Sequence, residues 1–261
     1  MTKHYIEYLL TAAMAVMTAQ SCVSKIDPIF DESSANRVEA LAERLNETLT
    51  GAPNGWLLEY YPSSGQYYGG FNVFLSFSES NKVKVGSEVA GKGKTATSTY
   101  SIYQSAGCVL TLDTYNEVMH YFADPETTGG QGAGFGFEGD FEFNVLDLQD
   151  EKITLKGRKT GSTMTMTPMP VSMSWDDYIV ALKEEESAIS KHTRIRYQTA
   201  DNKYDGRING RTLEIFSEVD GEQVTTSYPF IFNLMGVTFY KPLELGDERI
   251  DGLVYNPDLS L

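Results

Sequence analysis

Residues 135–145 read FGFEGDFEFNV, and their alternation decides the fold class predicted for this 261-residue chain. Aromatic residues, glycine and valine hold the odd positions, whereas Glu138, Asp140, Glu142 and Asn144 hold the even ones. Successive side chains of a β-strand point to opposite faces, so a period of two is typical of a strand with one buried face. A polar turn at 147–151 leads into a second alternating run at 153–158, which predicts an antiparallel hairpin.

The same alternation recurs on both sides of this hairpin. Further runs lie at 56–60, 71–77, 99–103, 109–112, 162–167, 194–198, 206–217, 224–234, 237–240 and 250–255. Two segments have helical spacing instead: 34–50, which Ser34 can cap, and 175–188, which opens with Ser174 and Asp177 in a capping box. The predicted fold class is α+β and predominantly antiparallel β, as a sheet, a sandwich or a partly open barrel with two helices. Since each helix precedes a β block (34–172 and 173–261), a tandem repeat is an alternative.

The N-terminus has the pattern of an export signal. Lys3 precedes the apolar stretch 8–19 (YLLTAAMAVMTA), which is too short to span a bilayer as a helix. Small residues then lead to Cys22, as in a lipobox. We therefore expect a signal peptide at 1–21, a lipid on the Cys22 sulfur that anchors the chain to a membrane, and a polar tether at 22–33. Cleavage without lipid is the alternative.

Composition excludes several classes of partner. The formal net charge of −15 argues against nucleic acid, because phosphate binding needs clustered Lys and Arg. Outside the signal, His120 and His192 are the only histidines, and there is neither an HExxH nor a CxxC motif, so we expect no metal site and no cofactor. With Cys22 acylated, Cys108 has no disulfide partner, and its apolar surroundings predict a buried thiol.

Three carboxylates are the best candidates for catalysis. Glu138, Asp140 and Glu142 would share one strand face at about 7 Å spacing, near that of acid–base pairs in glycoside hydrolases. However, Lys152, Lys156 and Arg158 follow in the next predicted strand, where cross-strand ion pairs would explain the same pattern. We therefore predict no catalytic residue, and keep a hydrolase as the alternative.

Two groups of residues are candidates for ligand binding. Trp56, Tyr67 and Tyr68 lie in the first predicted hairpin, and exposed aromatic rings with polar edges suit sugar rings. Asp113, Asn116 and His120 follow an apolar strand, where they either line a pocket or form a turn.

Four sequence blocks resemble a known family. In order, these blocks are Gly55-Trp56-Leu57 with Tyr60, Asp113-Thr114-Tyr115-Asn116 with His120, 139-GDFEF-143 and 153-ITLKGRKT-160. They are similar to uncharacterised surface lipoproteins of Bacteroidetes that carry a domain of unknown function and are typically encoded beside starch-utilisation-like outer-membrane uptake systems. The resemblance implies a lipid-anchored protein on the cell surface at the outer membrane, in a nutrient-uptake complex with a glycan ligand. A non-catalytic binding accessory is the function expected from it; a structural or adhesive surface protein is a further alternative.

Overall fold

The computed structural model describes residues 34–126, 134–198, 203–219 and 221–256. All contacts given below lie within one compact unit, Val38–Leu261. The predicted signal peptide, Cys22 and the tether lie outside the described residues.

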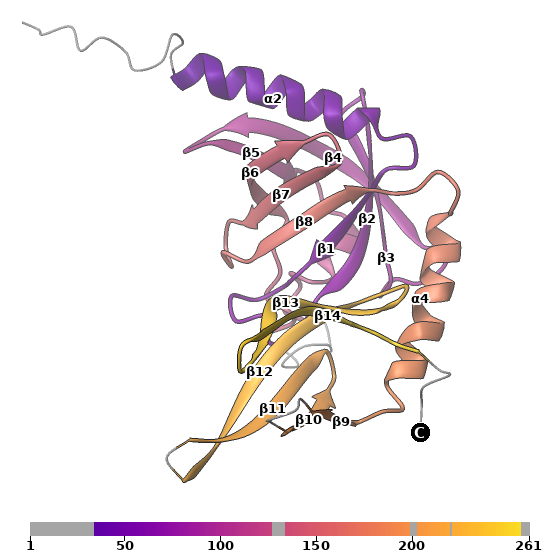
Figure 1. Ribbon diagram of the computed structural model, residues 1–261. Helices are drawn as coiled ribbons and strands as arrows, with labels where there is room; N and C mark the ends of the chain where they lie inside the picture. Colours follow the sequence, from indigo (N-terminus) through magenta and orange to yellow (C-terminus); the bar gives the residue numbers. More distant parts are fainter. Residues whose placement is uncertain (1–33, 127–133, 199–202, 220, 257–261) are drawn as a thin grey trace, which may run out of the picture. The chain divides into compact units, whose positions relative to one another are not determined.

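The first β block is a closed antiparallel barrel in which the strands follow one another in chain order (Figure 1). Its strands are β1 (Trp56–Tyr60), β2 (Phe71–Ser78), β3 (Lys82–Ser87), β4 (Thr95–Gln104), β5 (Cys108–Leu112), β6 (Glu142–Gln149), β7 (Lys152–Gly157) and β8 (Thr163–Pro168). The last strand pairs back onto the first, with Trp56 opposite Pro168. The predicted fold class, mostly antiparallel β with a barrel among its forms, is confirmed.

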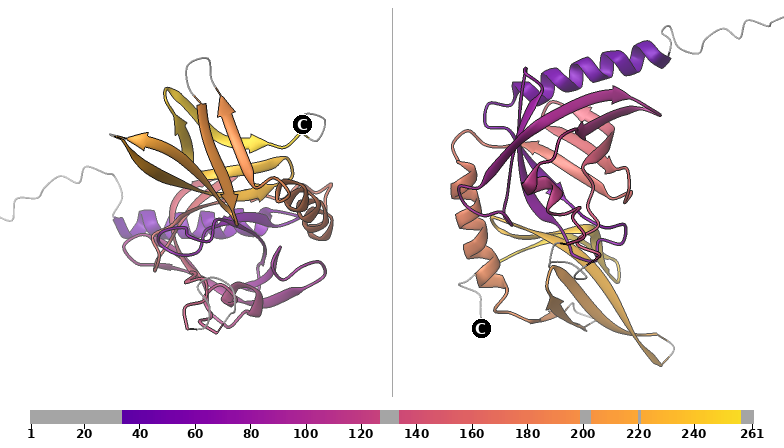
Figure 2. Two further views of the ribbon diagram at one scale, coloured as in Figure 1. Left: turned by 90° about the horizontal axis from the view of Figure 1, so that it is seen from below. Right: turned by 180° about the vertical axis from the view of Figure 1, so that it is seen from behind.

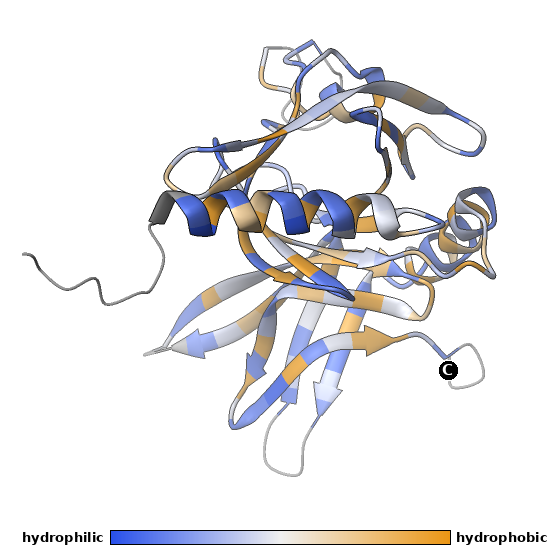
Figure 3. Ribbon diagram, turned by 90° about the horizontal axis from the view of Figure 1, so that it is seen from above, coloured by the Kyte–Doolittle hydropathy of each residue, from blue (hydrophilic) through white to orange (hydrophobic). Residues whose placement is uncertain are grey.

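Alternate side chains of the barrel strands fill the interior, as the period of two predicts, except in β6, where an irregularity between Val145 and Asp147 shifts the alternation. Trp56, Leu58 and Tyr60 of β1 are buried there, as is Cys108, whose thiol pKa burial raises. Helix α2 (Ser34–Gly51) adds Leu45 and Leu49 to this core. Figure 3 shows that the side of α2 seen from above is largely hydrophilic.

The stretch 135–145 is only partly the strand that its alternation predicts. β6 begins at Glu142, and the residues before it form turns. The backbone is left-handed at Gly134, Gly136 and Glu138, with φ of 94°, 55° and 57°. A left-handed residue at every second position is incompatible with an extended strand. The alternation thus reflects turn residues as well as strand residues.

The second β block is an open six-stranded antiparallel sheet. Its strands are β9 (Arg194–Gln198), β10 (Lys203–Asn209), β11 (Thr212–Val219), β12 (Glu222–Asn233), β13 (Gly236–Leu245) and β14 (Glu248–Val254). The segment 206–217, predicted as one strand, is a hairpin that turns at Gly210, where φ is 58°. β11 and β12 extend beyond the other strands (Figures 1 and 2). A helix precedes each block, as expected, but only the first sheet closes.

Helix α4 (Trp175–Ile189) packs against both blocks. Ser174 caps it, because its hydroxyl accepts a hydrogen bond from the Asp177 backbone N–H at 3.1 Å, as predicted. On its apolar side Trp175 stacks on Phe74 of β2 at 5.5 Å between ring centroids. β2 is therefore buried on both faces, towards the barrel interior and towards α4. A third helix, the short α3 (Glu117–His120), was not predicted.

Candidate functional site

The loop between β1 and β2 has an unusual and well-supported backbone. Ser63 and Gln66 are left-handed without being glycine, with φ of 62° and 52°. The Ser162 hydroxyl donates to the Ser63 carbonyl at 2.6 Å, and the Gln66 amide donates to the Ser162 hydroxyl at 3.0 Å. The Ser63 hydroxyl accepts from the Tyr67 backbone N–H at 3.2 Å. Such strained residues persist only where surrounding contacts hold them, and they concentrate at binding sites.

This loop presents two tyrosine rings. Tyr67 is 68% exposed, and its ring lies over Gly65, where an added Cβ would fall 2.2 Å from a ring carbon. Tyr68 is half-buried and meets Phe137 edge-on, with 5.2 Å between ring centroids. One ring is therefore free to stack on a ligand, while the other is fixed in the wall beside it.

Both tyrosines line a groove of about 1130 Å³ between the barrel and the six-stranded sheet. The barrel wall comprises Gly65, Gln66, Tyr67, Tyr68, Phe71 and Phe137. The opposite wall comes from β10 to β13 and includes Asn209, Glu214, Tyr228, Tyr240 and Lys241. Aromatic rings and hydrogen-bonding groups thus face one another across a space large enough for a small ligand.

The polar groups of the sheet wall are held in place. Asn209 and Arg207 donate to the Glu214 carboxylate at 3.0 and 2.6 Å, and these hydrogen bonds lower the pKa of Glu214. The Tyr240 hydroxyl accepts from the Thr163 backbone N–H at 3.0 Å. Glu214 is therefore an ionised acceptor, the opposite of what a general acid requires.

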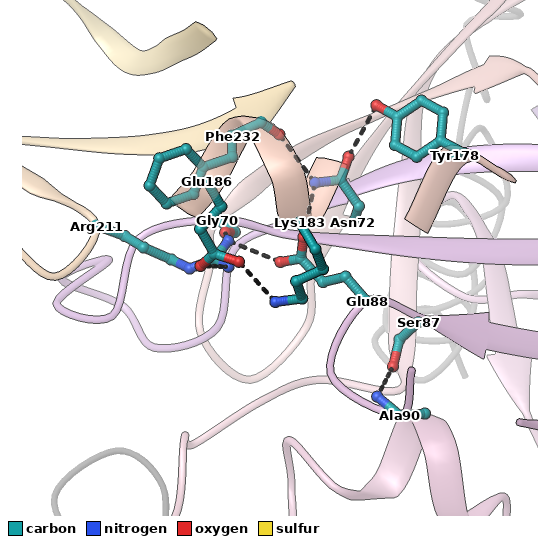
Figure 4. A network of polar contacts seen from close by, with 10 residues as sticks. All are labelled: Gly70, Asn72, Ser87, Glu88, Ala90, Tyr178, Lys183, Glu186, Arg211 and Phe232. Carbon is teal, nitrogen blue, oxygen red and sulfur yellow. Dashed lines mark hydrogen bonds and ion pairs between the residues drawn. The ribbon is translucent and has the colours of Figure 1, made fainter. Parts of the chain in front are cut away.

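Arg211 lies in the groove lining, but its guanidinium faces inward (Figure 4). It donates to the Gly70 carbonyl at 2.6 Å and pairs with Glu88 at 2.7 Å and with Glu186 at 2.9 Å. Its Cζ also lies 4.5 Å from the centre of the Phe71 ring. These contacts occupy the guanidinium. Because Gly70 and Glu88 belong to the barrel block and Arg211 to the six-stranded sheet, Arg211 joins the two β blocks.

Asn72 completes this buried network (Figure 4). Its amide donates to Glu88 at 3.1 Å and to the Phe232 carbonyl at 2.9 Å, and its oxygen accepts from the Tyr178 hydroxyl at 3.3 Å. Burial raises the pKa of Glu88, while Arg211 opposes that shift. No local pattern of residues indicates this network, because its members are far apart in the chain and each lies in an ordinary strand, turn or helix pattern.

The other predicted ligand residues lie elsewhere. Trp56 is 1% exposed in the barrel core, and its Nε1 donates to the Leu49 carbonyl, so its ring offers no surface to a ligand. Asn116 is the N-cap of α3, where its side-chain oxygen accepts from Val118 N and Met119 N. The turn, rather than the pocket, is therefore the correct alternative for Asn116.

His120 and Asp113 lie near this turn. The His120 ring stacks on Phe141 at 4.6 Å between centroids, and burial lowers its pKa. Asp113 is exposed and accepts from the Ser101 hydroxyl at 2.8 Å. Neither side chain lines the groove that holds Tyr67 and Tyr68.

The three carboxylates Glu138, Asp140 and Glu142 do not share one strand face, because only Glu142 lies in β6. Glu138 lies in the turn before β6, and Asp140 is 3% exposed. The Asp140 carboxylate accepts from Lys159 N at 2.7 Å and from Thr160 N at 3.1 Å, so it holds the turn between β7 and β8. Of the three, only Glu142 pairs with a cation as the alternative predicts, lying 3.8 Å from Arg158, which directly follows β7.

Among the residues that the structure describes, no three His, Cys, Asp or Glu side chains are grouped so as to hold a metal ion. Within the same residues, no helix has the length and apolar character needed to cross a membrane.

Comparison with known proteins gives one match. The family model described as "Domain of unknown function (DUF4302)" matches residues 26–257. No curated protein and no solved structure matches the chain.

Proposed function

We propose that this chain, which belongs to the DUF4302 family of domains of unknown function, is a non-catalytic binding protein that holds an oligosaccharide in the groove beside Tyr67. The observation that carries the proposal is the exposed Tyr67 ring, which a strained and hydrogen-bonded loop holds at the edge of a groove with polar walls. A sugar ring has an apolar face that stacks on an aromatic ring and hydroxyls that hydrogen-bond around its edge.

The charge of the groove favours a neutral glycan. Its walls carry Glu214 and Glu244 but only Lys241 as an unpaired cation among the charged side chains described there. The whole chain has a net charge of −15, which would repel an acidic polysaccharide at low ionic strength. Asn209, Ser227 and Glu214 supply hydrogen-bonding groups suited to hydroxyls.

The same proposal places the protein on the cell surface, anchored to the outer membrane by lipid on Cys22, where it acts as an accessory of a nutrient-uptake complex. It is supported by the apolar stretch 8–19, the small residues before Cys22 and the four sequence blocks described above. The hydrolase alternative loses its main support, because Asp140 is committed to the turn between β7 and β8.

The experiment is a titration of the full chain with a panel of neutral and acidic polysaccharides by isothermal titration calorimetry. At least one neutral member should bind, and Tyr67→Ala should weaken that binding by about tenfold or more, the loss typical of a central aromatic contact. Tyr115→Ala is the matched control, because Tyr115 is exposed to 69% and lies outside the groove lining.

Gly65→Ala gives an independent check. The new methyl group would displace the Tyr67 ring from its position without removing it, so glycan binding should weaken while the circular dichroism spectrum stays unchanged. The proposal fails if no neutral polysaccharide binds, if Tyr67→Ala binds as well as the wild type, or if the chain releases reducing ends from the glycan that it binds.

A further inference from the structure

The six-stranded sheet lines a second cavity, of about 260 Å³, that shares no lining residue with the groove. Each strand contributes at least one apolar side chain to its wall, and β13 and β14 contribute two each. In order from β9 to β14 these residues are Ile195, Ile208, Leu213, Phe230, Val237 with Phe239, and Leu253 with Val254. Ile189, the last residue of α4, closes it further. Leu213 and Phe230 are each 1% exposed, so the cavity lies inside the fold at this point.

The sheet is curled so that its two edge strands meet. In the backbone ladders, β9 pairs only with β10 and β14 only with β13 among the described strands. The Tyr197 hydroxyl of β9 nevertheless hydrogen-bonds to the Glu248 carboxylate of β14. The edges are thus joined by side chains rather than by a ladder, and the sheet surrounds the space between them.

The cavity opens to solvent on one side, beside the exposed residues His192, Val254 and Asn256, so a small molecule can reach its apolar wall. A cavity of roughly 150 Å³ lined by apolar residues stays dry and binds benzene. The cavity in this sheet is larger and has an apolar wall, so it suits an apolar group larger than benzene.

Among the described lining residues, the polar ones lie at the rim. His192, Tyr255 and Asn256 border the cavity where α4 ends and β14 leaves the sheet, and the His192 and Tyr255 rings are 5.7 Å apart. A ligand with one apolar chain and a small polar end would place the chain among the strands and the end at this rim.

We propose that this cavity is a binding site for a free small molecule with a single unbranched alkyl chain and a neutral, hydrogen-bonding end. A neutral end is specified because the net charge of −15 disfavours an anion. The site goes beyond the glycan groove and does not depend on it.

The probes are hexanol, octanol and decanol, titrated by calorimetry into the full chain produced without lipid. Affinity should rise by about fourfold for each added methylene, as expected from the burial of a CH₂ group, until the chain outgrows the cavity. The heat-capacity change of binding should be negative. No binding, or an affinity independent of chain length, would overturn the proposal.

Two variants fill the cavity from opposite edges of the sheet. Ile195→Trp on β9 and Leu253→Phe on β14 should each reduce octanol affinity at least tenfold. If one of the two variants fails to fold, the other still tests the proposal. Arg194→Trp adds the same ring at the neighbouring, exposed position of β9 and should bind octanol normally. Tyr67→Ala should also bind normally, which separates this site from the glycan groove.

Two other occupants would give different results. If the alcohols bind only to a chain that ends at Asn256, residues 257–261 fill the cavity and the proposal is wrong. If the alcohols fail but phosphatidylethanolamine vesicles bind and Ile195→Trp abolishes that binding, the alkyl chain belongs to a membrane lipid and a free ligand is excluded.

Discussion

Arg211 and Glu88 form an ion pair of 2.7 Å whose side chains are only 11% and 0% exposed. Arg211 precedes β11 and Glu88 follows β3, so the pair links the six-stranded sheet to the barrel. Glu186 of α4 shares the same guanidinium at 2.9 Å. Lys183 also pairs with Glu186, at 2.6 Å, so two cations face two carboxylates at the place where the barrel, the helix and the sheet meet.

Arg211→Met should destabilise the fold by ~3–5 kcal/mol, because the buried Glu88 carboxylate would lose its counter-charge. Urea unfolding followed by tryptophan fluorescence measures the change. Arg196→Met is the matched control: Arg196 pairs with Asp205 at 2.6 Å, but the two side chains are 59% and 55% exposed, so the unfolding midpoint should hardly move. Equal losses in the two variants would contradict the assigned role of Arg211.

The pH dependence of stability should reveal Glu88. Burial raises its pKa above the ordinary 4.5, against the influence of Arg211, Asn72 and Lys183. At pH values between the pKa of Glu88 in the unfolded chain and its higher pKa in the folded protein, the folded protein binds more protons at Glu88 than the unfolded chain does. The contribution of Glu88 to stability therefore falls as the pH rises through that window. The free energy of unfolding of the wild type minus that of Glu88→Gln should decrease from pH 4.5 upward. A difference that increases with pH would mean that the Arg211 charge outweighs burial.

Asp140→Asn should cost about 1–3 kcal/mol, the loss expected when a buried hydrogen-bonded group is left with an unsuitable partner. Its carboxylate accepts from two backbone N–H groups, and an amide NH₂ cannot replace both oxygens. Glu142→Gln tests the neighbouring carboxylate, which lies on the surface 3.8 Å from Arg158, and should cost under ~1 kcal/mol. Denaturant melts distinguish the two; similar small costs would restore the solvated carboxylate face predicted from the sequence.

Local patterns predicted most of the fold because burial in a barrel strand repeats every two residues. Trp56, Leu58 and Tyr60 share one face, and all are buried as expected. The same rule failed for Glu138, since a left-handed turn can also repeat every two residues when glycines alternate with other types. Hydrophobic periodicity therefore does not distinguish an extended strand from such a turn.

The candidate site was predicted only in part. Tyr67 and Tyr68 stood out because serines and glycines surround them, and they do line the groove. The opposite wall, with Asn209 and Lys241, comes from strands more than 130 residues later in the chain. Tertiary contacts at this separation leave no periodic signal in a single sequence.

Lipid attachment remains a prediction of the sequence, because Cys22 lies outside the described residues. Cys22→Ser removes the sulfur that would carry the acyl group, so labelling with radioactive palmitate in the native host should disappear and the protein should leave the detergent phase. Cys108→Ser is the control, because Cys108 is buried in the barrel and should not affect labelling. Palmitate retained by the Cys22→Ser variant would show that the anchor is elsewhere.

Gly69 tests the close approach of the barrel to the sheet. Its φ is 68°, and an added Cβ would lie 2.3 Å from Arg211 Cβ and 2.7 Å from the Phe230 carbonyl oxygen. Gly210 has a similar φ of 58° but open space around its Cα. Gly210→Ala should therefore cost only ~1–2 kcal/mol, the penalty of a left-handed backbone.

Gly69→Ala carries the same backbone penalty, and in addition it must push β11 and β12 away from the barrel. This movement would break the hydrogen bond of 2.9 Å from Gly70 N to the Phe230 carbonyl and strain the contact between Arg211 and Gly70 O. We expect Gly69→Ala to be the more destabilised of the two in urea and to give faster hydrogen exchange at the Gly70 amide. If both alanine variants unfold at the same urea concentration, the barrel and the sheet do not require a glycine at their closest approach.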